Sequence, residues 1–361
     1  MAYSITAAVT DPNRASGPEP TLEHLQLRAP GEGEVVVAIK AVGICHTDFF
    51  AGSLSETPMV PGHEGAGIIE AVGSGVDPAR IGERVALTFD SCGTCKRCHE
   101  DDPAYCESAL ELQFGLKETM QRDSGERVKG AFFKQSSFAT HVLATARNSI
   151  PIDDDLPFDL AAPLGCGIQT GYGAVVNEVK PRTDETLVVF GLGAVGLSAV
   201  SAAFNEKVRH IIAIDPIEER RTLALEMGAT DVFAPEAIGT PALSGRIADC
   251  AIDCAGTATT FQQGIDMLKA RGRFGVVAVP PPDKPISFVP LTLLDGGRQV
   301  FGIVEGGSDP TQFIPQLGRL ALSGALPLEK MIKRYTFSNF SQAWNDAAEG
   351  KTIKPVLVMD P

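Results

Sequence analysis

The stretch TLVVFGLGAVGLSAVSAAFNEKVRHIIAID, residues 186–215, decides much of the fold. Residues 186–190 form a short continuous apolar run, as a buried parallel strand requires. The motif GLGAVG at 191–196 fits GxGxxG, a helix is predicted directly after it, and residues 208–215 predict the next strand. In this strand–turn–helix–strand context, the glycine pattern is typical of a dinucleotide-binding unit.

Each part of this unit has a physical task. The first glycine makes the turn, the second lets the backbone approach a pyrophosphate, and the third lets helix and strand pack closely. The helix N-terminus supplies N–H groups to the phosphates. Asp215 would accept hydrogen bonds from the adenosine ribose and repel a 2′-phosphate, so NAD is favoured over NADP, although a nearby Arg220 or Arg221 can bind such a phosphate. The residues predicted to bind the cofactor here are Gly191, Gly193, Ala194, Val195, Gly196, Asp215 and Arg220.

The β/α alternation continues beyond this unit. Pro216 is predicted to open a helix that Gly228 ends. Strands are predicted at 248–254, 273–279 and 299–304, with a helix near 259–271. Together these elements predict a doubly wound parallel sheet. Cys250 and Cys254 lie on an apolar strand and are interpreted as buried core thiols rather than ligands.

The first ~150 residues have a different pattern, on the periodicity rules. Apolar and polar residues alternate up to residue 40, and again in 61–76 and 81–89, between glycine and proline clusters. This pattern predicts antiparallel strands with one solvated face. The segment KPVLVMDP near the end of the sequence predicts a strand that rejoins this β-rich domain. We therefore expect one domain from residues 1–167 and 303–361, with a cofactor domain, 168–302, inserted in it.

A second stretch, GICHTDFFAGSLSETPMVPGHEGAG at 43–67, carries Cys45 and His63 with the acidic neighbours Asp48 and Glu64. A further soft ligand, Cys166, occurs in LGCGIQTG. Two thiolates and one imidazole leave zinc an open fourth position, which is the arrangement of a catalytic site. The sequence therefore predicts a catalytic metal site built from these three residues.

Four more cysteines lie within a short segment, the predicted lobe at 90–110. Four thiolates at this spacing suit a closed tetrahedral zinc whose task is to hold a segment with little core of its own. A redox CxxC pair is the alternative, but it needs two cysteines and leaves two unexplained. His99 lies inside the loop and is interpreted as a surface residue. The predicted structural ligands are Cys92, Cys95, Cys98 and Cys106.

Composition restricts the partners and the compartment. The net charge is -14, so nucleic acid and an anionic membrane surface are not expected partners. No run of eighteen apolar residues occurs, and the N-terminus lacks the pattern of a signal peptide. Tightly spaced cysteines without an export signal favour thiolates in a reducing compartment, so a cytoplasmic location is expected.

On these residues the chain resembles the zinc-dependent medium-chain alcohol dehydrogenases over essentially its full length. The aryl (benzyl) alcohol dehydrogenase branch is most similar, through LTFDSCGTCKRC, DPAYC, FFKQSSFATHVLA and LGCGIQTGYGAV. The resemblance implies an α/β plus β fold, in which a GroES-like β-rich catalytic domain holds an inserted Rossmann domain. It also implies two Zn²⁺ per subunit, NAD, a small alcohol or aldehyde substrate, and a homodimer or homotetramer.

The resemblance also implies roles for single residues. Asp48 would steady the histidine ligand, Glu64 would lie behind the metal, and Thr47 would take the alcohol proton. The remaining matches concern the cofactor: Thr170 beside the nicotinamide, Val277 and Val279 beside its ring and amide, and Lys354 at the pyrophosphate.

One departure concerns the proton route. The liver-type enzymes have a histidine at the place of Phe50, which passes the proton to solvent, and here that imidazole is absent. Either His46 does this as well as contacting the pyrophosphate, or the proton leaves through ribose hydroxyls and water.

The predicted reaction is the interconversion of a primary alcohol and its aldehyde by hydride transfer. Phe49 and Phe50 favour an apolar pocket for an aromatic or allylic alcohol, although both can be core residues. Phe114, Phe132, Phe133 and Phe138 are a possible lid, pocket wall or core. The alternatives are a polyol or glutathione-adduct dehydrogenase, a reductase of a conjugated double bond, and a binding protein without activity.

Overall fold

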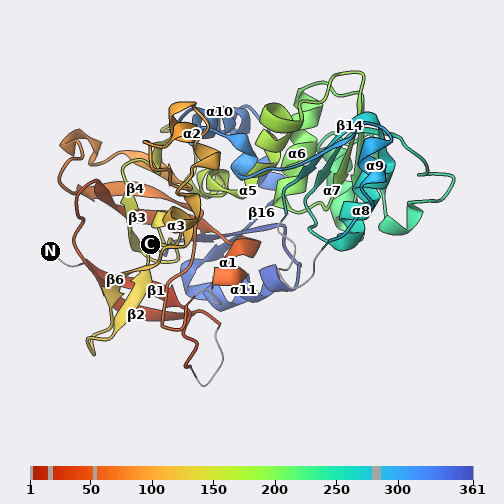
Figure 1. The fold of residues 1–361 in the computed structure, drawn as a ribbon. Helices are drawn as coiled ribbons and strands as arrows, with labels where there is room; N and C mark the ends of the chain where they lie inside the picture. Colours follow the sequence, from red (N-terminus) through yellow and green to blue (C-terminus); the bar gives the residue numbers. More distant parts are fainter. Residues whose placement is uncertain (1–2, 15–18, 52–54, 279–285, 361) are drawn as a thin grey trace. The chain divides into compact units, whose positions relative to one another are not determined.

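The structure is a computed structural model that describes residues 3–14, 19–51, 55–278 and 286–360 (Figure 1). The chain folds into two compact units. The first unit is discontinuous, because Met1–Cys166 is joined by Asp309–Gly324 and Met331–Pro361. The second unit consists of Gly167–Ser308 and Ala325–Lys330.

The first unit contains two sheets, as the alternating pattern predicts. A four-stranded antiparallel sheet has the order β1-β2-β6-β7, with β1 Tyr3–Val9, β2 Thr21–Leu27, β6 Lys117–Gln121 and β7 Arg127–Gly130. A seven-stranded sheet has the order β16-β17-β3-β4-β5-β9, and β8 also pairs with β3. Its strands are β3 Glu34–Gly43, β4 Gly65–Val72, β5 Arg84–Leu87, β8 His141–Thr145, β9 Ser149–Pro151, β16 Ile332–Thr336 and β17 Lys354–Val358. The β-rich prediction is confirmed.

The predicted return of the chain is also confirmed. Strand β17 pairs antiparallel with β3, placing Val356 opposite Gly43, and parallel with β16. Helices of this unit are α1 His46–Ala51, α2 Lys96–His99, α3 Ala109–Phe114, α4 Phe158–Ala161, α10 Pro310–Leu322 and α11 Phe340–Ala348.

The core of this unit combines inward-facing strand residues with one face of α11. Phe340 stacks on Trp344 at 5.8 Å between ring centroids, and Phe138 meets Phe340 edge-on at 5.2 Å. Burying such rings is the main favourable contribution to packing the amphipathic α11 against the sheets.

The second unit contains a six-stranded parallel sheet in the order β12-β11-β10-β13-β14-β15. Its strands are β10 Thr186–Phe190, β11 His210–Ile214, β12 Asp231–Phe233, β13 Ala248–Asp253, β14 Leu268–Val276 and β15 Gln299–Gly302. Its helices are α5 Gly167–Gly173, α6 Ala194–Asn205, α7 Glu218–Glu226, α8 Ala258–Met267 and α9 Leu291–Leu294. Strand order that reverses beside β10 is the doubly wound arrangement, so the predicted fold class is confirmed.

Several predicted boundaries differ from the observed ones, most clearly at two helices. The helix predicted near 259–271 ends at Met267, and the chain enters β14 at once, with an irregular register near its start. Arg271 has a positive φ of 64°, which a continuing helix does not allow. Helix α7 begins at Glu218 rather than Pro216, because the Ile217 N–H donates to the side chain of Asp215 and Ile217 becomes the N-cap.

Among the described residues, no helix is long and apolar enough to cross a membrane.

Candidate functional site

The three predicted catalytic ligands come together in the first unit. Cys45 follows β3, His63 precedes β4, and Cys166 follows a short turn at Ala162–Gly165. One ligand atom from each, together with a carboxylate oxygen of Glu64, lies within 4.8 Å of the others. Sulfur and imidazole nitrogen are the donors that zinc prefers, so the set fits this metal.

Asp48 organises two of the ligand segments. Its Oδ1 accepts a hydrogen bond from His63 Nδ1 at 2.7 Å and from the Gly62 N–H at 3.1 Å, and its Oδ2 accepts one from the Cys45 N–H at 2.9 Å. This fixes the tautomer and directs Nε2 of His63 away from the carboxylate. Nε2 is fully buried and has no hydrogen-bond partner in the described part of the chain. A buried nitrogen without a partner is costly unless it binds a cation.

The electrostatics of the cluster suit a cation. Burial alone would lower the pKa of His63, but the carboxylate of Asp48 raises it well above its ordinary value. The pKa of Cys45 lies well below the ordinary value of a thiol, chiefly because Cys166 donates a hydrogen bond to its sulfur. The thiolate is the form that binds metal.

Glu64 and Lys354 form a fully buried ion pair beside these ligands. Lys354 Nζ lies 2.8 Å from both carboxylate oxygens of Glu64 and 3.3 Å from the carbonyl oxygen of Ile44. Gly43 makes room for the carboxylate, since a Cβ there would lie 2.1 Å from Glu64 Oε2. All three N–H donors of Lys354 are therefore in use, and the predicted pyrophosphate contact would require this pair to open.

The other residues near Cys45 are placed as follows. Thr47 Oγ1 lies 3.9 Å from Cys45 Sγ. His46 and Phe50 are exposed, whereas Phe49 packs on Trp344 with 4.3 Å between ring centroids. Phe49 thus contributes to the core, which is the alternative role noted for it.

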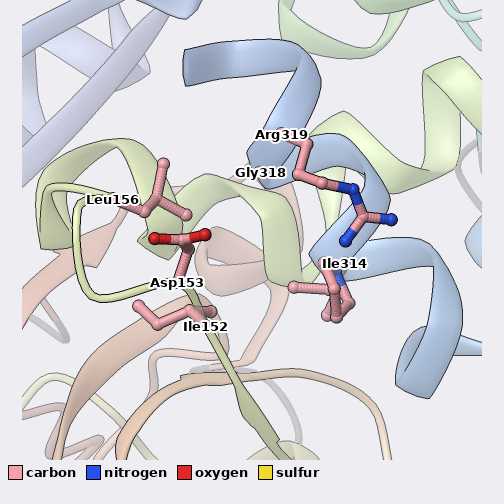
Figure 2. A pocket seen from close by; sticks show the side chains of 7 residues that line it. Ile152, Asp153, Leu156, Ile314, Gly318 and Arg319 are labelled. Atoms are coloured by element: carbon pink, nitrogen blue, oxygen red, sulfur yellow. The ribbon is translucent and has the colours of Figure 1, made fainter. Parts of the chain in front are cut away.

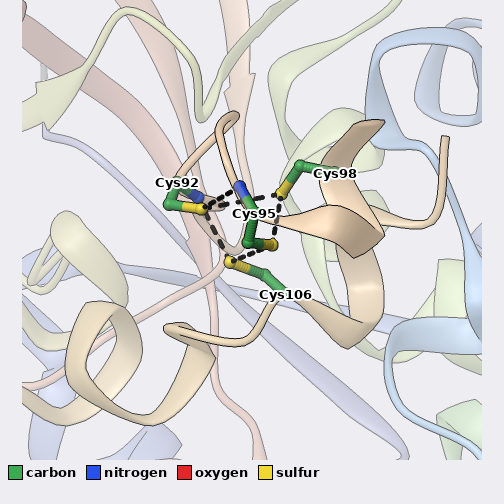
Figure 3. Close-up of side chains that lie close together, drawn as sticks. All are labelled: Cys92, Cys95, Cys98 and Cys106. Carbon is green, nitrogen blue, oxygen red and sulfur yellow. Dashed lines mark hydrogen bonds between the residues drawn. The ribbon is translucent and has the colours of Figure 1, made fainter. Parts of the chain in front are cut away.

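The four-cysteine cluster is also assembled (Figure 3). Sulfur–sulfur distances are 3.5 Å for Cys95–Cys98, 3.9 Å for Cys92–Cys98 and 4.0 Å for Cys95–Cys106. A tetrahedral zinc with Zn–S bonds of about 2.3 Å requires sulfurs about 3.8 Å apart, so the cluster fits a closed site. The N–H and hydroxyl of Thr94 and the Cys95 N–H donate to Cys92 Sγ and lower the pKa of that thiol to about 5.

The glycine motif of the second unit has the predicted geometry. Gly193 caps α6, which begins at Ala194, and a Cβ on Gly196 would lie 1.8 Å from the Gly191 carbonyl oxygen, so helix and strand pack too closely for any side chain there. Asp215 is buried, and its carboxylate accepts the Leu192 and Ile217 N–H groups at 2.7 and 2.8 Å. Arg220 lies 4.0 Å from this carboxylate.

Two further predicted cofactor residues, Thr170 and Val277, also lie in the second unit. Thr170 in α5 donates to Glu305 Oε2 at 3.3 Å. Val277 follows β14, and its N–H donates to the carbonyl of Asp253 at 3.0 Å. Val279 lies outside the described residues. Cys250 is buried and its pKa is raised to about 12, chiefly by burial.

Sequence reasoning missed two polar residues beside the catalytic ligands. Gln135 and Thr88 are buried. Gln135 hydrogen-bonds to the backbone of His63 and Gly65, and Thr88 hydrogen-bonds to the backbone of Gly165, the residue before Cys166. Thr88 was visible only as a polar residue in the apolar run at 85–89, and Gln135 only as one of four consecutive polar residues at 134–137. Neither signal identifies a role.

A small hollow of about 90 Å³ lies in the first unit between residues 152–156 and α10 (Figure 2). Its lining combines the charged side chains of Asp153 and Arg319 with apolar side chains that include Leu156 and Ile314. None of the predicted site residues lines this hollow.

Comparison with known proteins adds independent information. Residues 31–154 match the family "Alcohol dehydrogenase GroES-like domain", and residues 194–321 match "Zinc-binding dehydrogenase". A geraniol dehydrogenase of Castellaniella defragrans is 38% identical over 351 residues, covering 93% of this chain and 94% of the relative.

Two solved structures are similar along the whole chain. An alcohol dehydrogenase zinc-binding domain protein from Burkholderia ambifaria has a TM-score of 0.93 at 38% identity, covering 100% of both chains. A benzyl alcohol dehydrogenase from Acinetobacter calcoaceticus has a TM-score of 0.90 at 36% identity, covering 99% of this chain and 100% of the other.

Proposed function

Because this chain belongs to the zinc-dependent medium-chain alcohol dehydrogenases, we propose that it interconverts a primary aromatic or allylic alcohol and its aldehyde, with NAD as hydride carrier. One observation carries the proposal. Two cysteines and a histidine from distant parts of the sequence converge, and the nitrogen of His63 that faces away from Asp48 is buried without a partner in the described residues.

The catalytic zinc would be held by Cys45, His63 and Cys166, and it would supply the Lewis acidity that lowers the pKa of an alcohol. The chain's own part is to orient and to move a proton. Asp48 holds the imidazole so that Nε2 serves as ligand. Thr47 Oγ1, near Cys45, takes the proton of the substrate hydroxyl. No imidazole occupies position 50, so exposed His46 or solvent receives that proton.

Lys354 sets the charge behind the ligands. The two thiolates already bring two negative charges, and an unpaired Glu64 carboxylate would add a third at a fully buried position. The Lys354 ammonium cancels that charge at 2.8 Å. Because the charge of Glu64 is neutralised within this pair, a metal ion bound here would have to neutralise only the two thiolate charges.

We also propose a second, structural zinc on Cys92, Cys95, Cys98 and Cys106, which makes two Zn²⁺ per subunit. Thiolate ligands at both sites fit a reducing, cytoplasmic environment. A homodimer or homotetramer is proposed from family membership.

NAD rather than NADP is proposed because Asp215 closes the second strand of the dinucleotide unit with a buried carboxylate. A 2′-phosphate would meet this negative charge. Arg220 is already close to that carboxylate, at 4.0 Å, and is thereby partly neutralised.

The substrate class is drawn from two relatives whose names state it, a geraniol dehydrogenase and a benzyl alcohol dehydrogenase. Geraniol and benzyl alcohol are both primary alcohols, and in each the carbon that bears the hydroxyl is bonded to an unsaturated carbon. A spectrophotometric assay of NADH formation with benzyl, cinnamyl, geranyl and short aliphatic alcohols tests the proposal. Higher kcat/KM for the first three supports it, whereas a preference for polyols or glutathione adducts, or saturation of a double bond, contradicts it.

A further inference from the structure

Gln135 ties the backbone on both sides of Glu64. Its side chain is 1% exposed. Nε2 donates to the His63 carbonyl oxygen at 2.9 Å and to the Thr88 carbonyl oxygen at 3.2 Å, while Oε1 accepts the Gly65 N–H at 3.1 Å. One carboxamide therefore fixes the two peptide groups that flank Glu64, the residue after His63, and joins them to Thr88, the residue after β5.

Thr88 extends this connection to the third ligand. Its side chain is fully buried, and Oγ1 donates to the Gly165 carbonyl oxygen at 2.7 Å, one residue before Cys166. The Thr88 carbonyl oxygen accepts from Gln135 and also from Asn148 Nδ2 at 3.2 Å. A continuous chain of hydrogen bonds thus runs from the segment of His63, through Gln135 and Thr88, to the segment of Cys166.

The segment that carries Gln135 adopts an unfavourable backbone. Four of its non-glycine residues have positive φ, namely Ala131 at 63°, Phe133 at 50°, Lys134 at 54° and Ser136 at 50°. Such conformations persist only where the surroundings determine them, and they concentrate at functional sites. Here the segment turns Gln135 inward and places the Phe133 ring 4.7 Å from the His63 ring, between centroids.

We propose that Gln135 and Thr88 are positioning residues that hold the His63 and Cys166 segments in register, so that both ligands reach one metal ion. Neither side chain ligates the metal or contacts the substrate. Their effect is to slow the opening of the ligand set, and so to slow metal release. The inference rests on the proposed function in one respect, that a metal occupies the site of Cys45, His63 and Cys166.

The test measures metal release from the two sites of the full-length protein. Co²⁺ is loaded into both sites, and its release to a chelator is followed by the thiolate–cobalt absorption. We compare wild type with Gln135→Met and Thr88→Val, which keep side-chain size and remove the hydrogen bonds. Thr88→Ser restores the hydroxyl. Gln113→Met is the matched control, because Gln113 is also a buried carboxamide, 7% exposed, that bonds the backbone of Asp90 through both its ends.

Loss of an outer partner lowers metal affinity by about 10–100-fold in known sites. We expect release from the three-ligand site to accelerate about tenfold in Gln135→Met and Thr88→Val, with an altered cobalt spectrum of that site. Release from the four-cysteine site should stay unchanged. Thr88→Ser should return to the wild-type rate, and Gln113→Met should leave the three-ligand site as in wild type.

Two results would overturn the inference. One is a release rate from the three-ligand site within twofold of wild type in both Gln135→Met and Thr88→Val. The other is equal acceleration at both sites, or equal acceleration in Gln113→Met, which would show general loosening of the unit. If one variant does not fold, the other decides. A wild-type protein that binds cobalt only at the four cysteines would refute the proposed function itself, and this is seen before any variant is measured.

Discussion

Replacing Lys354 by methionine should destabilise the first unit strongly. The substitution keeps an unbranched side chain close in length to the apolar stem of lysine and removes the ammonium that lies 2.8 Å from both oxygens of Glu64. The side chains of the pair are 0% and 3% exposed, so the remaining carboxylate has no access to water. Removing one partner of a buried pair costs about 3–5 kcal/mol, and we expect a loss of this size in the free energy of unfolding.

A double-mutant cycle separates the pair from its packing. Glu64→Met alone should cost a similar amount, because it leaves the ammonium of Lys354 buried without its carboxylate partner. The double variant Glu64→Met/Lys354→Met replaces both charges by apolar groups of similar volume, which is often neutral. We therefore expect it to lie within about 1 kcal/mol of wild type, measured by urea unfolding of the metal-loaded protein.

The same variants decide the role of Lys354. If each single variant costs less than about 1 kcal/mol, or the double variant is as unstable as the singles, the buried-pair reasoning is refuted. The Kd for NAD provides a second readout. An unchanged Kd in the double variant means that Lys354 acts on Glu64 alone. A large increase in Kd supports the predicted contact between Lys354 and the pyrophosphate.

Three further predictions concern the metal sites and the second unit. Cys45→Ser or His63→Ala should abolish turnover and lose one metal while the Kd for NAD is kept; wild-type turnover would contradict the catalytic site. Cys98→Ser should lose the other metal and lower Tm with little change in KM, and retention of that metal and of Tm would contradict a structural role. Burial alone would raise the pKa of Glu185, but the guanidinium of Arg273 outweighs it, so the pKa of this carboxyl lies below its ordinary value. This carboxylate therefore stabilises the fold above its unfolded pKa of about 4.3, and the benefit is lost as pH falls through the lower folded value. Glu185→Gln should be less stable than wild type at pH 7, and the difference should shrink progressively as the pH falls below about 4; a constant difference in urea midpoint would contradict this.

Much of the fold could be predicted because its signals are local. The strand at 186–190 is an unbroken apolar run followed by glycines, and it was found with its observed bounds. The end of the helix near 259–271 was predicted wrongly, because an apolar residue such as Leu268 fits the buried face of a helix as well as a buried strand. Its strand partner, Ala248, lies on β13, and pairing between segments is not encoded in either one alone.

The candidate site also contains some residues that could be predicted from the sequence and others that could not. Clustered cysteine and histidine have few roles in proteins, so Cys45, His63 and the four-cysteine lobe could be selected as candidate ligands from residue type and spacing. Glutamine and lysine have many roles. Gln135 meets His63 across 72 positions, and Lys354 meets Glu64 across 290, so only the folded chain shows what either side chain contacts.

The discontinuity of the first unit has a consequence for biosynthesis. A ribosome produces β3, β4 and Glu64 early, and it then translates every strand of the parallel sheet before it reaches β17 and Lys354. Until that moment the nascent chain holds an uncompensated anion in what will become a dry interior, and β3 lacks one neighbour. The early segment of the first unit therefore stays incompletely folded and accessible to water and chaperones until the second unit and β17 have been synthesised.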